Sequence, residues 1–159
     1  MEKPRKPADE DKRLEAVTLE EALSRVKAQE SKYKTLLDET TDLVQSVDAQ
    51  GRILYANKAM LTALGYAFEE ALQMNVFDLI APESREHCAL VMGRVLKGEA
   101  CDGLDVVFLT KSGSRVLARG RASCHFEDGQ AAYTRGVFRD ITVQTRTEKR
   151  LAAQFAATK

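Results

Sequence analysis

The spacing of apolar residues in the first part of the chain predicts a long amphipathic helix. From Ala16 onward, apolar positions recur at alternating steps of three and four residues, as in a heptad seam, with Glu30 as a polar interruption. We expect a helix over residues 16–40 that pairs with a second copy as a two-stranded parallel coiled coil, or that folds onto its own domain. The residues of this seam are Leu19, Leu23, Val26, Tyr33 and Leu37. Residues 1–15 hold little that could be buried and are expected to be disordered.

After residue 41 the pattern changes to short strands and helices. The stretches "LVQSVD" and "RILYAN" flank a turn that contains glycine, which predicts a hairpin. Asn57 can cap the helix "KAMLTALGY", and Gly65 ends it. Two short helical pieces, "AFEEALQM" and "NVFDLI", then lead to a longer helix from Pro82 to about Lys97.

The last third of the domain predicts three strands. They are "LDVVFLTK", "SRVLARGRASCHF" and "AAYTRGVFRD", and the turns "KSGS" and "EDGQ" between them favour an antiparallel meander. The element order predicts an α+β fold: a five-stranded antiparallel sheet with helices on one face. The final strand runs without turn residues into a segment of helical period, so we expect an outgoing helix over residues 143–159.

Composition narrows the classes of function. The 159 residues suit one domain, and 24 basic residues balance 24 acidic ones, so no basic field indicates a nucleic-acid partner. The sequence contains neither a secretion signal nor an apolar run long enough for membrane insertion, which predicts a cytoplasmic protein. The three cysteines lack the CxxC spacing of a metal site, and no catalytic motif is present, so we expect a non-catalytic protein.

Several stretches resemble the PAS domain family: "DLVQSVDAQGRILYANKAMLTALGYAFEEAL", "FDLIAPESR" and "GVFRDIT". The resemblance implies that residues 41–142 form a sensory PAS domain of a bacterial signalling protein of the histidine-kinase type. It also implies a homodimer that transmits a conformational signal through flanking helices to an output such as a histidine kinase or a cyclic-dinucleotide enzyme. The alternative is a free-standing PAS adaptor that binds partners in trans.

The resemblance also assigns signal coupling to three consecutive residues, Asp140, Ile141 and Thr142, which join the last strand to the outgoing helix. Thr142 can cap this helix, and Asp140 places a negative charge at its positive end. Ile141 is expected to anchor the joint in the core.

Whether the chain can bind a known PAS cofactor can be judged from the residues at the positions that contact it. In light-sensing flavin PAS domains a cysteine adds to the flavin, and Val76 stands at that position here, which excludes this adduct. The favoured expectation is that no cofactor is bound. Flavin held without the cysteine stays open, and so does haem, for which His87 is the candidate axial ligand. However, His87 lies about a quarter of a turn from the apolar face of its helix. In addition, Asp105 stands where haem-binding relatives that sense oxygen carry an arginine.

A small-molecule cavity between sheet and helices is compatible with this fold, although the same apolar residues can instead form a filled core. The candidate lining residues are Leu54, Leu64, Leu79, Val91, Val107, Leu117 and Phe138.

Overall fold

The computed structural model describes the backbone of residues 7–157 and the side chains of residues 18–156. The chain divides into two compact units, residues 1–37 and residues 38–159, which are considered separately. The first unit is built on helix α1 (Pro7–Glu39). This helix begins ahead of the predicted start at residue 16, and a proline is well tolerated in its first turn. The predicted disordered segment therefore overlaps α1 from Pro7 on, and residues 1–6 lie outside the described part.

The apolar seam of α1 faces solvent in the single chain. Leu19 and Tyr33 are each 65% exposed, and Leu23 and Val26 are exposed to a similar degree, whereas Leu37 is half-buried. Exposed leucine, valine and tyrosine at heptad spacing are unfavourable in water unless they are covered. The seam is thus available for a partner.

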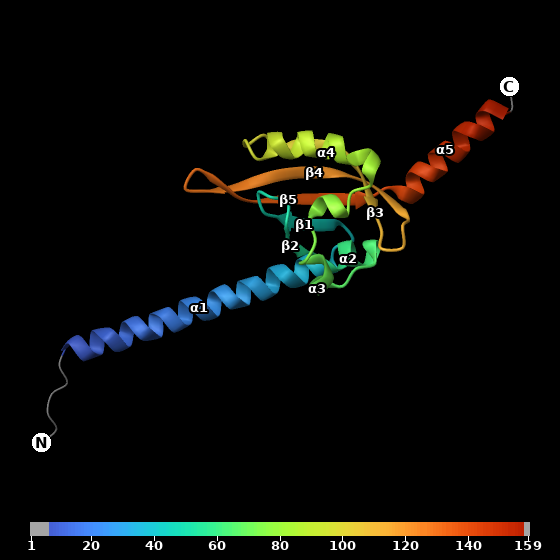
Figure 1. Cartoon of the computed structure of the whole chain (residues 1–159). Coiled ribbons are helices and arrows are strands. Elements are labelled where there is room, and N and C mark those ends of the chain that lie inside the picture. The colour runs from blue at the N-terminus through green and yellow to red at the C-terminus, as the bar shows by residue number, and fades with distance from the viewer. Residues whose placement is uncertain (1–6, 158–159) are drawn as a thin grey trace, which may run out of the picture. The chain divides into compact units, whose positions relative to one another are not determined.

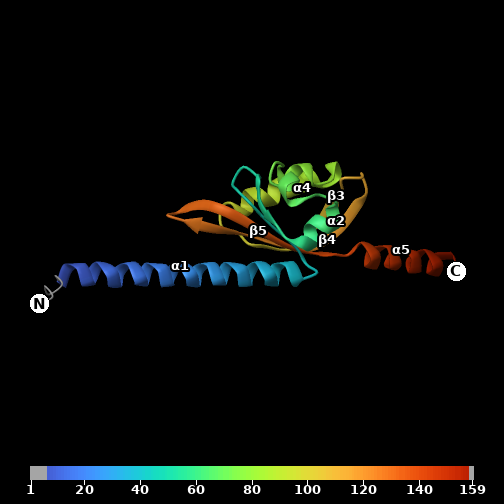
Figure 2. The same cartoon turned by 90° about the horizontal axis from the view of Figure 1, so that it is seen from below.

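The second unit is a five-stranded antiparallel sheet with the strand order β2-β1-β5-β4-β3. Both the predicted hairpin and the predicted meander are confirmed, with β5 placed between β1 and β4. Figures 1 and 2 show that the β4–β5 hairpin extends beyond the other strands. The strands are β1 (Leu43–Val47), β2 (Ile53–Ala56), β3 (Cys101–Leu109), β4 (Arg115–Glu127) and β5 (Gln130–Asp140).

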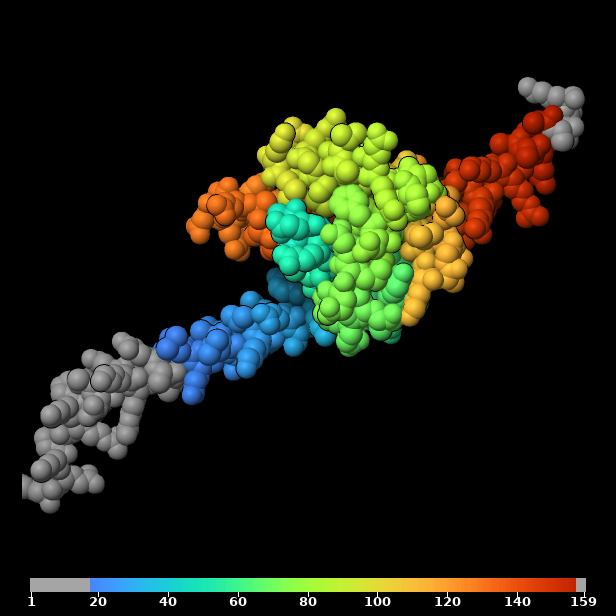
Figure 3. Space-filling model, viewed as in Figure 1, coloured from blue at the N-terminus to red at the C-terminus, as the bar shows by residue number. Residues whose placement is uncertain are grey.

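Four helical segments follow β2 and lie on one face of the sheet, where they form much of the surface visible in Figure 3. Asn57 caps the first of them, as predicted: it is fully buried, and its Oδ1 accepts the N–H groups of Met60 and Val44. Its Nδ2 donates to the carbonyl of Asp42, so one side chain ties the start of a helix to β1. The segments are α2 (Lys58–Leu64), α3 (Phe68–Ala71), η1 (Val76–Asp78) and α4 (Pro82–Val95).

Helix α4 is held against the sheet by its apolar face and by backbone hydrogen bonds at its start. Cys88, Val91 and Val95 are buried beneath it. Just before the helix, the Ala81 N–H donates to the carbonyl of Val107 at 2.8 Å, which joins this turn to β3 like an additional strand pair. The helix and the sheet therefore enclose a common core.

The end of the sheet nearest the C-terminus is closely packed around Phe138. Its ring meets that of Phe108 edge to face at a centroid distance of 5.5 Å. A Cβ on Gly120 would lie 2.7 Å from the Cα of Phe138 and would overlap the carbonyl oxygen of Val137. Only glycine permits this approach between β4 and β5.

Helix α5 (Thr142–Ala157) follows β5 with one residue between them. Its Val143 is 78% exposed and its Phe155 73% exposed, so this helix does not cover the sheet with its apolar side chains. Among the described residues, no helix combines the length and apolar character needed to cross a bilayer.

Candidate functional site

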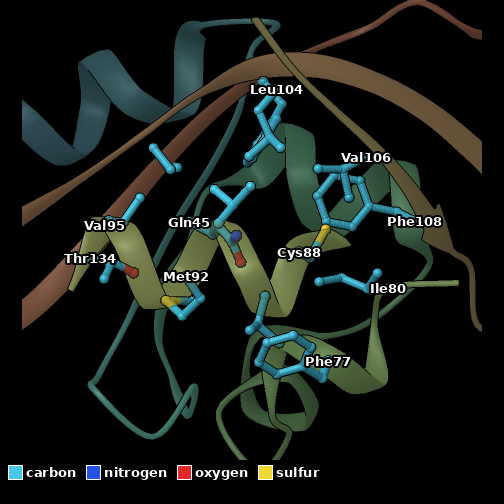
Figure 4. Close-up of a pocket in the computed structure, with 15 residues that line it drawn as sticks. Gln45, Phe77, Ile80, Cys88, Met92, Val95, Leu104, Val106, Phe108 and Thr134 are labelled. Atoms are coloured by element: carbon cyan, nitrogen blue, oxygen red, sulfur yellow. The ribbon is translucent and has the colours of Figure 1, made fainter. Parts of the chain in front are cut away.

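A cavity of about 50 Å³ lies between α4 and the sheet. Its wall comes from β1, η1, α4 and the three long strands, and most of it is aliphatic or aromatic (Figure 4). The lining residues are Gln45, Val76, Phe77, Ile80, Cys88, Val91, Met92, Val95, Leu104, Val106, Phe108, Ala122, Thr134, Gly136 and Phe138. A pocket of this kind, apolar with few polar groups, is typical of a small-molecule site.

Two uncharged polar side chains enter this apolar wall, Gln45 from β1 and Thr134 from β5. Gln45 Oε1 is buried and accepts no hydrogen bond from the described residues. Thr134 is buried as well. The buried hydroxyl of Tyr55 lies outside the cavity, where burial and the nearby Asp38 carboxylate raise the pKa of the phenol.

Sequence reasoning missed both polar residues, although a signal was present. Gln45 lies between Leu43 and Val47 on the same face of β1, because side chains two positions apart in a strand point the same way. Thr134 similarly shares a face of β5 with Phe138. A polar residue in the apolar alternation of a strand marks a polar group that points into the core.

Of the seven predicted cavity residues, Val91 and Phe138 line the cavity. Leu64 and Leu79 are buried in the core but do not line it. The other three predictions were wrong by one position along the strand. A residue next to each of them points into the core, so the predicted side chain lies on the opposite face of the sheet. Leu54 is exposed, and Val107 and Leu117 are half-buried.

The predicted haem ligand is in the wrong place for that role. His87 is exposed on α4 and does not line the cavity. Asp105 is exposed on β3 and pairs with Arg119 at 2.7 Å. A cavity with room for a few water-sized molecules is also far too small for a porphyrin ring. Within the described part of the chain, no group of three or more potential metal ligands is found.

The position of the flavin-reactive cysteine lies in the cavity wall and carries Val76, an apolar side chain. The wall does contain one thiol, that of Cys88. Burial raises the pKa of Cys88 to about 11, so the thiol is protonated near neutral pH and is a poor nucleophile. Neither Val76 nor Cys88 therefore favours covalent attachment of a ligand near neutral pH.

The joint between β5 and α5 is hydrogen-bonded to a single residue of β4, Leu117. The Ile141 N–H donates to the carbonyl of Leu117 at 2.8 Å. The N–H of Leu117 donates to Thr142 Oγ1 at 2.9 Å. The Thr142 hydroxyl in turn donates to Asp140 Oδ1 at 2.6 Å. Both backbone groups of one β4 residue thus bind the start of α5.

The three predicted coupling residues are brought together, but their roles differ from the expectation. Asp140 acts as the cap: its Oδ1 accepts the Thr142 N–H at 3.0 Å. Thr142 does not cap the helix with its hydroxyl, since that group binds Leu117 and Asp140. Ile141 is half-buried and contributes mainly its backbone, so its expected place in the core was wrong.

The cavity and the joint share strand β5. Phe138 lines the cavity, and two residues later Asp140 holds the start of α5. In the same register, Phe138 pairs with Gly120 and Asp140 pairs with Ala118. One strand therefore carries both a residue of the cavity wall and the residue that caps α5.

Comparison with known proteins agrees with this architecture. The cell-division control histidine kinase PdhS of Brucella abortus (strain 2308) is 29% identical in an alignment 133 residues long that covers 79% of this chain and 12% of that kinase. The chain thus spans only a small part of this curated relative. The same similarity is found for PdhS of Brucella suis biovar 1 (strain 1330), again over 12% of its length.

Solved structures share the fold. The PAS domain of a protein from Colwellia psychrerythraea has a TM-score of 0.63 at 28% identity, with 74% of this chain and 98% of that chain covered. A domain of a sensory box sensor histidine kinase/response regulator from Geobacter sulfurreducens has a TM-score of 0.59 at 23% identity, with 72% and 96% covered. A family model described as PAS fold matches residues 31–141. Because this match extends over more than half of the sequence, the chain belongs to the PAS family and is a distant homologue of the PAS domains of histidine kinases.

Proposed function

We propose that this chain is a cytoplasmic sensory and dimerisation module that passes a change in its cavity through α5 to an output domain. The observation that carries the proposal is the hydrogen-bonded joint, in which Ile141 and Thr142 bind Leu117 of β4 and Asp140 caps α5. A flexible linker would absorb a small movement of the sheet, whereas this joint transmits it to the helix. The distant homology to histidine kinases supports a kinase output, and a cyclic-dinucleotide enzyme would suit the same joint.

Cavity filling tests this transmission without a known ligand. Ala122 lines the cavity, so Ala122→Val adds two methyl groups to the wall and acts as a built-in occupant. We expect altered hydrogen exchange of the α5 backbone amides in this variant, measured by mass spectrometry. Ala89→Val is the matched control, because Ala89 lies on the exposed side of α4. Unchanged exchange in α5, with altered exchange confined to the cavity wall, would refute the proposed coupling.

The proposed homodimer is formed by the exposed seam of α1. Replacing Leu23 and Val26 with glutamate places charges in a coiled-coil interface and should yield monomers in light scattering. Glutamates at Ser24 and Ser31, exposed positions on the outer face of the helix away from the seam, serve as the control and should leave the dimer intact. A variant of the seam that keeps the same molar mass in solution as the unmodified chain would contradict this interface.

The second candidate is an adaptor that acts on partners in trans. The exposed apolar residues of α5 fit either function, since they can continue into an output domain or bind a separate protein. The reading frame after Lys159 separates the two. A phosphoacceptor helix or a cyclase signature in that frame supports the module in cis, and a stop codon supports the adaptor.

A further inference from the structure

The cavity wall contains a hydrogen-bond acceptor without a partner among the described residues, the side-chain oxygen of Gln45. This Oε1 atom is buried. The amide lies against the backbone of β5, since a Cβ on Gly136 would be 3.3 Å from Gln45 Nε2. Buried carbonyl oxygens are nearly always paired, because an unpaired one has lost its hydrogen bonds to water. A hydrogen-bond donor in the cavity would pair this oxygen.

The rest of the wall restricts the charge of that donor. Thr134 is the second polar group, on the same face of β5 as Gly136, and it offers a hydroxyl. No lining residue is charged. An ion would lose its hydration without gaining a counter-charge, so the occupant must be neutral.

Size and polarity together also favour an occupant other than water alone. A water molecule needs about 10–15 Å³ of such space and two to four polar partners. The cavity of about 50 Å³ would hold several waters, but only Gln45 and Thr134 can bind them, and the wall beyond these two residues is apolar apart from the weakly polar Cys88 thiol. A molecule with an apolar body and one polar end matches both regions.

We infer that the cavity binds a small neutral molecule of roughly three to five non-hydrogen atoms that donates a hydrogen bond to Gln45 Oε1, with a short-chain alcohol as the simplest example. The hydroxyl donates to Gln45 and can accept from Thr134, while the hydrocarbon part contacts residues such as Val91 and Phe138. This inference rests on the proposed function only in treating the cavity as the input of the sensor.

Two probes of nearly equal shape test the hydrogen bond. 2-Butanol donates and accepts, whereas butanone only accepts. Each is titrated into the isotope-labelled full chain, and the NMR chemical shifts of the cavity residues are followed. We expect saturable shifts at the cavity wall and a dissociation constant about 2- to 13-fold lower for 2-butanol, the ratio for one net hydrogen bond.

Variants connect that preference to one side chain. Gln45→Leu keeps a similar volume but removes the acceptor, so the two probes should bind it equally. Gln73→Leu makes the same exchange at an exposed position and should keep the preference for 2-butanol. The inference is overturned by a cavity that shows no saturable shifts with 2-butanol, by butanone binding as tightly, or by a preference that survives in Gln45→Leu.

The same spectra separate this inference from the proposed function. Preferential binding of 2-butanol at the cavity wall with unmoved α5 resonances supports the ligand class and contradicts signal transmission. Absent binding of 2-butanol, combined with an α5 response to Ala122→Val, contradicts the ligand class and leaves the coupling intact.

Discussion

Replacing Thr142 with valine removes one hydroxyl from the joint and leaves the shape of the side chain almost unchanged. That hydroxyl accepts the N–H of Leu117 at 2.9 Å and donates to Asp140 at 2.6 Å. In Thr142→Val the N–H of Leu117 loses its acceptor in a half-buried position. The Asp140 carboxylate retains the backbone N–H of residue 142, at 3.0 Å in the unmodified chain.

The expected loss at the joint is about 1–2 kcal/mol, the lower part of the range for an unpaired buried donor, because the site is only partly buried. Native-state hydrogen exchange measures this loss at a single atom. The Leu117 amide should exchange about 5- to 30-fold faster in Thr142→Val, and the first amides of α5 should lose protection with it.

Two further substitutions serve as controls for the Thr142 hydroxyl. Thr142→Ser retains the hydroxyl and should preserve slow exchange at Leu117. Thr147→Val removes a hydroxyl that binds only the carbonyl of Val143 within α5 and should leave Leu117 unaffected. If the Leu117 amide exchanges at the same rate in Thr142→Val as in the unmodified chain, the hydroxyl does not fasten the helix to the sheet.

Further substitutions test the fold around the site. Asn57→Ala leaves two N–H groups and one carbonyl unpaired and should lower the free energy of unfolding by about 3 kcal/mol in urea denaturation; a loss below about 1 kcal/mol would contradict the assigned hydrogen bonds. Gly120→Ala should cost about 3 kcal/mol or more because its Cβ overlaps the neighbouring strand, whereas Gly93→Ala, with open space in α4, should stabilise by about 0.5–1 kcal/mol; equal effects would refute the close strand approach. At pH 8, iodoacetamide should modify the other two cysteines of the folded chain and spare Cys88, as counted by mass spectrometry. Since the folded-state pKa of Cys88 is raised from 9.0 to about 11, its contribution to stability is present below pH 9 and is lost as the pH rises toward 11, so Cys88→Ala should weaken this decline in the unfolding midpoint.

The order of elements could be predicted because local residues determine it. Asn57 caps α2, and Gly65 ends it in a left-handed conformation at φ 82°. Pro82 begins α4, and glycine-containing turns separate β3, β4 and β5. Each of these signals acts within a few residues of its own position, so the pattern predicts it without knowledge of the tertiary structure.

The cavity wall could not be predicted to the same extent because it depends on strand parity and on long-range pairing. Val107 and Leu117 are as apolar as Val106 and Val116, but a shift of one position moves a side chain to the other face. The placement of β5 beside β1 brings Thr134 close to Gln45, and that pairing joins segments far apart in the sequence. The joint was predicted in position but not in detail, since its acceptor Leu117 belongs to a different strand.

Occupation of the cavity is expected to move α5 relative to the sheet. This movement can be measured as the distance between spin labels at Arg150 of α5 and Ser123 of β4, both exposed, in a chain whose Cys101 and Cys124 are replaced by serine. Saturating 2-butanol should shift the distance distribution, and Gln45→Leu should reduce this response at the same alcohol concentration. An unchanged distribution, with the cavity shown by NMR to be occupied, would contradict the account.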